Sequence, residues 1–475
     1  MNQSDYVQHD ATALAALVHK GTVSAEEVTA AAIARAQLVN PKINAIVTPT
    51  YEAALETARR KPSGRLAGIP FLIKDLNFVK GVRCSLGSRL WDQFVPDHDA
   101  EIVTRYRNAG LVILGKSNTP EVGLAATTES VLLGPCRNPW DLSRTSGGSS
   151  GGAAAAVAAG IVPVAHATDG GGSIRIPASC CGLVGLKPTR GRTPLGPDTG
   201  EGWGGMAVGH VVSRSVRDSA LLLDVSHGPA RGDPYCAPAF SGSFVEALST
   251  DPRPLRVAID LEPVSGGAVH PECHEAVKRS AELLSSLGHH VETESPIYDR
   301  MKFTRATDTL VLANVANAIH SRAAATGVTF GPDCVERLTY RLAEIGRSLS
   351  AELYANAVHH IHAIGRQIES FFENYDLILS PTLLQPPVPL GYLDTNSEDG
   401  ETYGEHFRSF WGFTSLYNAT GQPAISLPLH RSADGLPVGV QLAAPFGDEA
   451  RLLQVSAQIE RAVGGFTQRP SLAAI

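Results

Sequence analysis

Two glycine-rich segments, RTSGGSSGGAAAA at 144–156 and TDGGGSIRIPA at 168–178, are the most informative part of this chain. Each places a serine beside consecutive glycines, Ser149 in the first segment and Ser173 in the second. A catalytic serine needs a base and a set of donors for the oxyanion that it creates. Glycine lets the backbone approach a substrate closely and direct its N–H groups inward. Two such clusters in one stretch favour acyl-transfer chemistry over flexible turns.

The two segments resemble the signature of the amidase signature family of serine hydrolases. Further matching pieces occur in the family's order along the chain: GIPFLIKD at 68–75, GP at 134–135, NPW at 138–140, GLKPT at 185–189, SPT at 380–382 and GQPA at 421–424. Many family members carry Pro at position 146 and the sequence Asp-Thr-Gly-Gly or Asp-Ile-Gly-Gly at positions 169–172. This chain has Ser146, a difference that puts no catalytic residue in doubt, and its triple glycine resembles the branch of 6-aminohexanoate cyclic-dimer hydrolases and aryl acylamidases.

The resemblance implies a Ser-Ser-Lys triad without histidine. Ser173 is the expected nucleophile, and Lys74 is the expected base, which requires a neutral amine. The apolar neighbourhood 71–73 disfavours the ammonium form of Lys74 and lowers its pKa. Ser149, which follows a cis peptide in this family, is expected to pass the proton between the two. The competing interpretation of Lys74 is a salt bridge with the adjacent Asp75.

The resemblance also assigns the residues around the triad. The expected oxyanion donors are the backbone N–H groups of Gly170, Gly171, Gly172 and Ser173. The side chains expected to hold the two glycine loops in place are those of Ser150, Asp169 and Arg175. No cofactor and no catalytic metal are expected.

Composition restricts the class of protein. The chain has 475 residues, 43% of them hydrophobic, and a net charge of −7. It contains no basic run and no apolar window of membrane-spanning length, so nucleic acid and membrane are poor partners. The polar, acidic start lacks a signal region, and the seven scattered cysteines have no zinc spacing. We therefore expect a cytoplasmic protein with reduced thiols.

Short apolar runs alternate with helical stretches along the chain, which predicts an α/β fold with a central mixed β-sheet covered by helices on both faces. The predicted strands are 70–74, 111–114, 161–165, 255–259 and 377–380, and the predicted helices include 101–109, 151–159, 270–287 and 351–374. Two helices are expected within 10–40, capped by Asp10 and by Ser24 with Glu27, the second ending at Asn40-Pro41. One amidase domain over 1–475 is expected, with an excursion at 228–254 and a long loop at 385–405.

Two other nucleotide or hydrolase motifs compete with this interpretation. GGSSG at 147–151 satisfies the G-x-S-x-G elbow of α/β-hydrolases, but that motif needs a preceding strand, and 138–144 is polar and turn-like. GLVILGKS at 110–117 satisfies the P-loop pattern, but its four apolar residues predict a buried strand that ends near Lys116.

Histidines and cysteines offer weaker alternatives. His359, His360 and His362 lie in a predicted helix and are expected to form a polar face. His166 is a base by type, although a neutral histidine beside a strand end is the favoured interpretation. Cys180 and Cys181 are expected to pack beneath the site.

The expected activity is hydrolysis of small-to-medium uncharged amides, anilides or cyclic amides through an acyl-enzyme. Two alternatives stay open: the glutaminase subunit of an aminoacyl-tRNA amidotransferase, and a catalytically inactive binding relative. Pocket residues are expected from 127–136, 195–210, 305–330 and 383–418, with the glycine-rich segment 195–206 at the border of the site. A homodimer is implied at the level of the family only.

Overall fold

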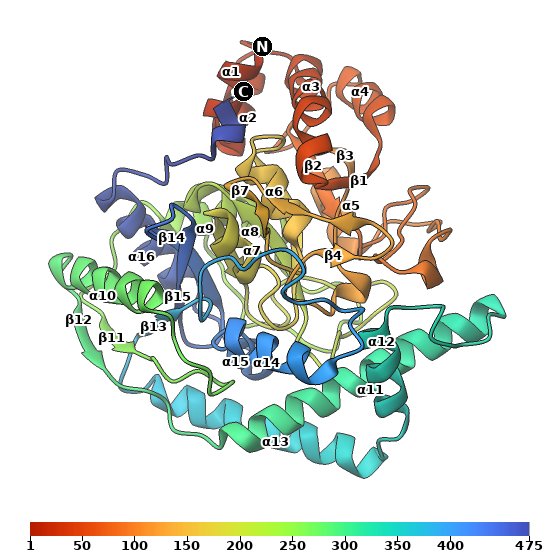
Figure 1. Ribbon diagram of the computed structural model, residues 1–475. Helices are drawn as coiled ribbons and strands as arrows, with labels where there is room; N and C mark the ends of the chain where they lie inside the picture. The colour runs from red at the N-terminus through yellow and green to blue at the C-terminus, as the bar shows by residue number, and fades with distance from the viewer. Residues whose placement is uncertain (475) are drawn as a thin grey trace.

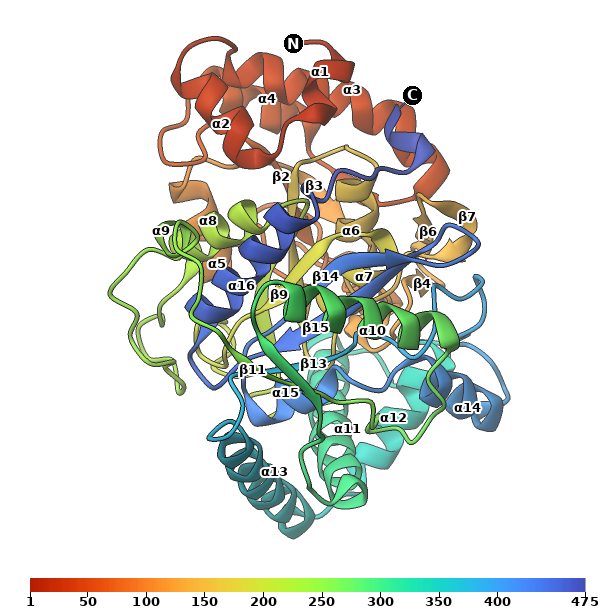
Figure 2. The same cartoon turned by 90° about the vertical axis from the view of Figure 1, so that its left-hand side faces the viewer.

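An eight-stranded mixed sheet runs through the middle of the molecule, as the computed structural model of residues 1–474 shows (Figures 1 and 2). From edge to edge the strands are β12 (His290–Thr293), β11 (Arg256–Ile259), β13 (Leu377–Pro381), β15 (Pro437–Ala443), β14 (Ala424–Arg431), β9 (Val184–Lys187), β10 (Val208–Ser213) and β8 (Val164–Asp169). β11 pairs in parallel with both β12 and β13, and the remaining neighbours are antiparallel. The predicted mixed sheet is confirmed.

Helices cover both faces of this sheet, and the alternation along β15 shows how. Gly439 and Gln441 contact α7 (Arg175–Cys181), which covers one face of the sheet. The Gly439 N–H donates to Ser179 Oγ at 2.8 Å, and Gln441 Oε1 accepts from Arg175. Val438, Val440 and Leu442 point to the other side and share an apolar cluster with α10 (Pro271–Ser286), α8 (Val216–Ser226) and α16 (Glu449–Ala462). Successive side chains of a strand point to opposite faces, so each face is buried by its own helices.

A smaller, three-stranded sheet adjoins the first. Its order is β1 (Ile46–Pro49), β3 (Val112–Ser117), β2 (Pro70–Lys74), with β2 parallel to β3. β2 lies beside β8 of the large sheet, where the Lys74 N–H donates to His166 Nδ1 at 3.4 Å. The two sheets therefore meet along a seam at the end of β2.

The remaining elements surround these sheets (Figure 1). They are the helices α1 (Gln3–Gln8), α2 (Ala11–His19), α3 (Ala25–Ile43), α4 (Tyr51–Arg59), α5 (Glu101–Asn108), α6 (Gly151–Ala158), α9 (Phe244–Ala247), α11 (Arg300–Thr326), α12 (Arg337–Arg347), α13 (Ala351–Phe371), α14 (Gly400–Phe410) and α15 (Ser415–Thr420), the 3-10 turns η1 (Arg89–Trp91), η2 (Glu121–Gly123) and η3 (Ser471–Ala474), and the short pairs β4 (Glu129–Ser130) with β5 (Gly134–Pro135) and β6 (Arg137–Asn138) with β7 (Asp141–Thr145). Within residues 1–474, no helix combines the length and the apolarity needed to cross a membrane.

The predicted N-terminal helices are confirmed, with one error at an end. Asp10 caps α2, and Ser24 with Glu27 forms the capping box of α3. α3 continues beyond the predicted stop to Ile43, with Pro41 inside its last turn. A proline there removes only one backbone hydrogen bond, and Asn44 then ends the helix in the left-handed conformation.

Three other boundaries differ from the prediction. The strand predicted over 161–165 begins at Val164, because 160–163 forms the turn that leaves α6. α14 begins inside the predicted loop 385–405, where Asp399 caps it with bonds to two backbone N–H groups. The segment 138–144 was expected to be turn-like, but it contains β7, which pairs with β6 in a two-stranded hairpin outside the main sheet.

Candidate active site

Ser149 and Ser173 line the same cavity, which has a volume of about 230 Å³. Ser149 lies just before α6, and Ser173 lies between β8 and α7, so both serines sit at turns that end in helices. The cavity walls come from segments far apart in the sequence: Leu76, Asn77, Phe78, Ala100, Val122, Gly123, Thr168, Gly170, Leu195, Asp198, Thr199, Gly202, Trp203, Ala207 and Val208.

Lys74 reaches Ser149 across the seam between the two sheets. Its Nζ lies 2.7 Å from Ser149 Oγ and 2.9 Å from Thr168 Oγ1. The Gly148–Ser149 peptide bond is cis, as the resemblance implies. A side chain at Gly148 has no room, because its Cβ would lie 2.4 Å from the carbonyl oxygen of Thr127. The loop geometry around Ser149 therefore requires glycine.

The Lys74 amine is completely buried. Burial lowers the pKa of Lys74 well below its ordinary value, and the charge of Asp169 opposes that shift only in part. The Asp75 carboxylate does not pair with it, because Asp75 Oδ1 lies 3.1 Å from the buried Lys116 Nζ and Oδ2 accepts from Ser85. The salt-bridge interpretation of Lys74 is therefore wrong, and a neutral amine at this position is favoured.

The glycine loop before Ser173 is held from both sides. The Gly171 carbonyl oxygen accepts from Trp411 Nε1 at 3.0 Å and from Thr414 Oγ1 at 2.6 Å. The Gly172 N–H donates to Asp169 Oδ1 at 2.7 Å. Gly172 was expected among the oxyanion donors, but this N–H is already committed to a carboxylate. Within residues 1–474, the N–H groups of Gly170, Gly171 and Ser173 have no acceptor.

Asp169 and Arg175 form a buried ion pair beneath this loop. Arg175 Nη2 donates to Asp169 Oδ1 at 2.9 Å, and Nη1 donates to Gln441 Oε1 at 2.7 Å. Asn418 Nδ2 also donates to Asp169 Oδ1, at 2.8 Å. Burial by itself raises the pKa of Asp169, but the Arg175 guanidinium outweighs it and the pKa falls to about 2. The carboxylate is therefore a fixed acceptor that aligns the loop.

A family model described as amidase matches residues 27–453. The chain belongs to the amidase family. It is 40% identical to 6-aminohexanoate-cyclic-dimer hydrolase of Paenarthrobacter ureafaciens, covering 98% of this chain and 96% of that protein. A solved 6-aminohexanoate cyclic dimer hydrolase complexed with substrate superposes with a TM-score of 0.93 at 39% identity, over 98% of this chain and 99% of that one. A bacterial aryl acylamidase of the amidase signature family gives 0.90 at 28% identity, with 98% of each chain covered.

The remaining predicted residues either hold the glycine segments together or are buried without a role in the proposed reaction. Ser150 Oγ donates to the Thr168 carbonyl oxygen at 3.2 Å and so links the two glycine segments. His166 is completely buried, and this burial is the largest cause that lowers its pKa to about 3. It is neutral, and its Nδ1 is occupied by the Lys74 backbone. Cys180 and Cys181 are buried, and burial raises the pKa of both thiols.

The P-loop-like segment and the histidines of α13 take the structural roles that were expected of them. The P-loop-like segment contains β3, with Lys116 near its end. His359, His360 and His362 are exposed on α13. The elbow interpretation gains a strand in β7, but β7 belongs to a peripheral hairpin. Within residues 1–474, no group of three or more His, Cys, Asp or Glu side chains is arranged to hold a metal.

Of the predicted pocket segments, 195–210 contributes most to the cavity wall. Leu195, Asp198 and Trp203 line it, and the Trp203 ring packs on Gly170, where an added Cβ would lie 2.8 Å from the ring. The segments 127–136, 305–330 and 383–418 do not line this cavity. Two residues of the last segment, Trp411 and Thr414, instead donate hydrogen bonds to the Gly171 carbonyl oxygen of the glycine loop.

Three functional residues were missed by sequence reasoning. Thr168 stands inside the quoted signature, next to Asp169, yet no role was given to its hydroxyl, which contacts Lys74. Trp411 and Thr414 carry no recognisable signal, because they reach the loop from 240 and 243 residues away.

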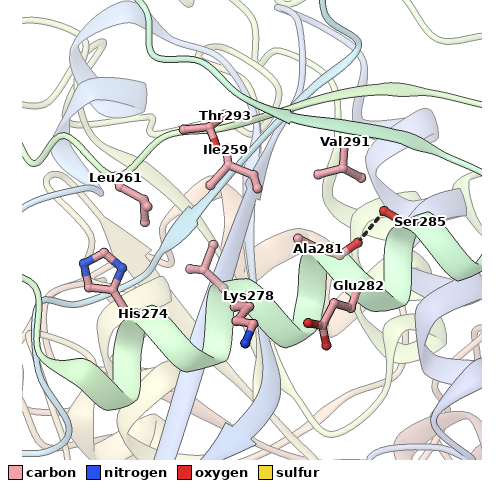
Figure 3. Close-up of a pocket in the computed structure, with 10 residues that line it drawn as sticks. Ile259, Leu261, His274, Lys278, Ala281, Glu282, Ser285, Val291 and Thr293 are labelled. Carbon is pink, nitrogen blue, oxygen red and sulfur yellow. Dashed lines mark hydrogen bonds between the residues drawn. The ribbon is translucent and has the colours of Figure 1, made fainter.

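A second, larger cavity of about 530 Å³ is an open groove between α10 and the strands β11 and β12 (Figure 3). Apolar side chains such as Val277 and Val291 line it, and none of Ser149, Ser173 and Lys74 does. The cavity that holds both serines is therefore the candidate active site.

Proposed function

We propose that this amidase hydrolyses carboxylic amides through an acyl-enzyme on Ser173. The observation that carries the proposal is the 2.7 Å contact between the buried Lys74 amine and Ser149, in a cavity shared with Ser173. A neutral amine with a free lone pair is a base, and a hydroxyl can accept one proton while it gives another.

In the proposed acylation, Ser173 Oγ attacks the amide carbon while its proton moves to Ser149 Oγ and the Ser149 proton moves to Lys74 Nζ. The oxyanion is bound by the free N–H groups of Gly170, Gly171 and Ser173. Such donors contribute about 3–4 kcal/mol each to transition-state binding. The carbon–nitrogen bond then breaks as the proton returns through Ser149 to the leaving amine. Water, deprotonated by the same relay, attacks the acyl-enzyme and releases the carboxylic acid.

We propose small-to-medium uncharged amides as substrates, including anilides and cyclic amides. The cavity wall is mostly apolar, and Asp198 is the ionisable side chain on it. Its carboxylate is half-exposed and lies 2.8 Å from His98 Nε2. A negative charge at this wall disfavours anionic substrates. The names of the related hydrolase and acylamidase support cyclic and aryl amides. A single domain and a homodimer are proposed at the level of the family.

The proposed nucleophile is tested by labelling with a fluorophosphonate. We expect rapid labelling of the wild type, none of Ser173→Ala, and slow labelling of Ser149→Ala. Ser143→Ala, at an exposed serine of β7, is the matched control and labels like the wild type. Labelling of Ser173→Ala at the wild-type rate together with loss in Ser149→Ala would favour the elbow interpretation instead.

The substrate class is tested with the purified chain and a panel of aliphatic amides, anilides, cyclic amides and glutamine. We expect hydrolysis of anilides and aliphatic amides, with some ester hydrolysis, because an acyl-enzyme forms from both. If the chain ignores the panel and releases ammonia from glutamine only with partner subunits and charged tRNA, the glutaminase alternative is correct.

A further inference from the structure

Glu121 is a buried carboxyl group close to the active site that the proposed reaction does not use. It is 3% exposed and begins the 3-10 turn η2. Its Oε2 accepts the backbone N–H of Glu336 at 2.7 Å. Glu336 is the residue before α12, so its N–H lies at the start of that helix. The Glu121 side chain therefore ties η2 to the N-terminus of α12.

The other end of η2 faces the proposed proton relay. Val122 and Gly123 both line the cavity. A Cβ added to Gly123 would lie 3.4 Å from Ser149 Oγ and 2.9 Å from Leu76 Cδ1. Gly123 thus forms the wall directly beside the serine that contacts Lys74, and a small displacement of this turn changes the space around Ser149.

The conformation of η2 needs external support. Val122 has a φ of +43°, in the left-handed region that β-branched residues rarely adopt. Its N–H donates to the Leu86 carbonyl oxygen at 2.7 Å. Its side chain packs against an apolar cluster that includes Val315 and Ile319 of α11 and Ala343 of α12. The turn is therefore held by the α11–α12 pair through one apolar contact and one buried carboxyl group.

Glu336 itself serves a different part of this network. Its Oε1 accepts the Val131 N–H at 2.8 Å, and its Oε2 accepts from the Thr395 hydroxyl. Neither contact reaches the cavity wall. The two neighbouring carboxyl groups thus have separable tasks: one points to the turn beside Ser149, and the other points to the loops that surround α12.

We propose that Glu121 is a positioning residue that fixes the Val122–Gly123 wall against Ser149 by anchoring it to α12. The inference rests on the proposed function. The anchor requires an oxygen acceptor at the distance of a glutamate side chain. Burial raises the pKa of Glu121 to about 7, and either protonation state keeps such an acceptor. Length therefore matters more than charge.

Because length matters more than charge, two conservative variants test the inference, with an anilide that the wild type hydrolyses as the substrate. Glu121→Gln keeps the length and loses the charge, so we expect kcat within about twofold of the wild type. Glu121→Asp keeps the charge but is one methylene too short to reach the Glu336 N–H. A small misplacement near reacting groups costs about tenfold or more in kcat, and we expect that loss in Glu121→Asp with little change in KM.

Glu336→Gln is the matched control in the same network. It keeps its backbone N–H, so we expect a lower melting temperature and an unchanged kcat. Wild-type kcat in Glu121→Asp, or a kcat in Glu121→Gln as low as that of Glu121→Asp, would overturn the inference while leaving the proposed function intact. No hydrolysis by the wild type itself refutes the proposed function and the inference with it.

Discussion

Replacing Lys74 by methionine separates catalysis from folding at this site. Methionine has a similar length and no base, so Ser149 loses the acceptor that lies 2.7 Å away. His166 is not a substitute, because its Nδ1 already accepts a backbone N–H and its low pKa leaves it a poor proton acceptor. General-base catalysis contributes about 10²–10⁴-fold, so we expect a loss of that size, or about 3–5 kcal/mol of barrier lowering.

The same substitution is expected to leave stability unchanged or raised near neutral pH. Folding lowers the pKa of Lys74, so the unfolded chain holds a proton that the folded chain has released. That difference lowers the free energy of unfolding of the wild type at pH values below the ordinary lysine pKa, and the loss becomes smaller as the pH rises. Methionine has no proton to release, so its melting temperature at pH 7 should equal or exceed that of the wild type.

The assay measures kcat/KM for an anilide between pH 5 and 10 together with thermal unfolding. Wild-type activity is expected to rise with pH as Lys74 loses its proton, and to set in well below the range of a free lysine. The matched control is Lys116→Met, which leaves Asp75 buried without its cation. We expect a loss of about 3–5 kcal/mol in stability there, with the pH profile retained. A Lys74→Met enzyme within tenfold of wild-type activity refutes the lysine-base mechanism.

Three further predictions concern the loop and the cavity wall. Arg175 opposes the effect of burial and leaves the pKa of Asp169 at about 2, against an ordinary 3.8. About 2 kcal/mol of stability is therefore present at neutral pH and is lost as the pH falls from about 5 to 2. In urea unfolding over this range, the wild type should lose about 2 kcal/mol more stability than Asp169→Asn; equal losses in the two proteins would contradict this contribution. Gly172→Ala should lower kcat at least 100-fold, because the φ of Gly172 is +136° and an added Cβ would lie 2.3 Å from Thr414 Oγ1. In the control Gly171→Ala, the added Cβ has no atom within 4 Å, so this variant should fold and unfold like the wild type. Equal kcat in Gly172→Ala and the wild type would contradict the role of the loop. Asp198→Asn should raise kcat/KM about fivefold for amides that carry a carboxylate and leave neutral amides unchanged; equal effects on both classes would exclude a charge effect at the wall.

Local signals in the sequence predicted much of the site and its supporting elements. The apolar run Pro70–Lys74 forms the buried strand that carries the lysine, and the alanine-rich helix after Ser149 begins at Gly151, as predicted. Caps at Asp10 and Ser24 are decided by side-chain contacts within a few residues, so the sequence shows them directly. These are the features for which near neighbours determine the conformation.

Features that depend on distant segments were not predictable. The commitment of the Gly172 N–H to Asp169 follows from the orientation that Arg175 and Asn418 impose on that carboxylate. Trp411 and Thr414 resemble any other residues of a variable region until the fold brings them to Gly171. Asp75 pairs with Lys116 instead of Lys74 because of the register between β2 and β3, and this register cannot be read from either strand alone.

The seam between the two sheets makes enzymatic activity a reporter of tertiary assembly. The lysine ends β2 of the three-stranded sheet, and Ser173 follows β8 of the large sheet, so neither sheet contains a complete relay. Each half can gain its backbone hydrogen bonds before the seam closes. During refolding, circular dichroism is therefore expected to recover ahead of turnover, and the interval between the two signals measures how fast the sheets dock. Conversely, agents that loosen only the seam inactivate the enzyme while its secondary structure persists.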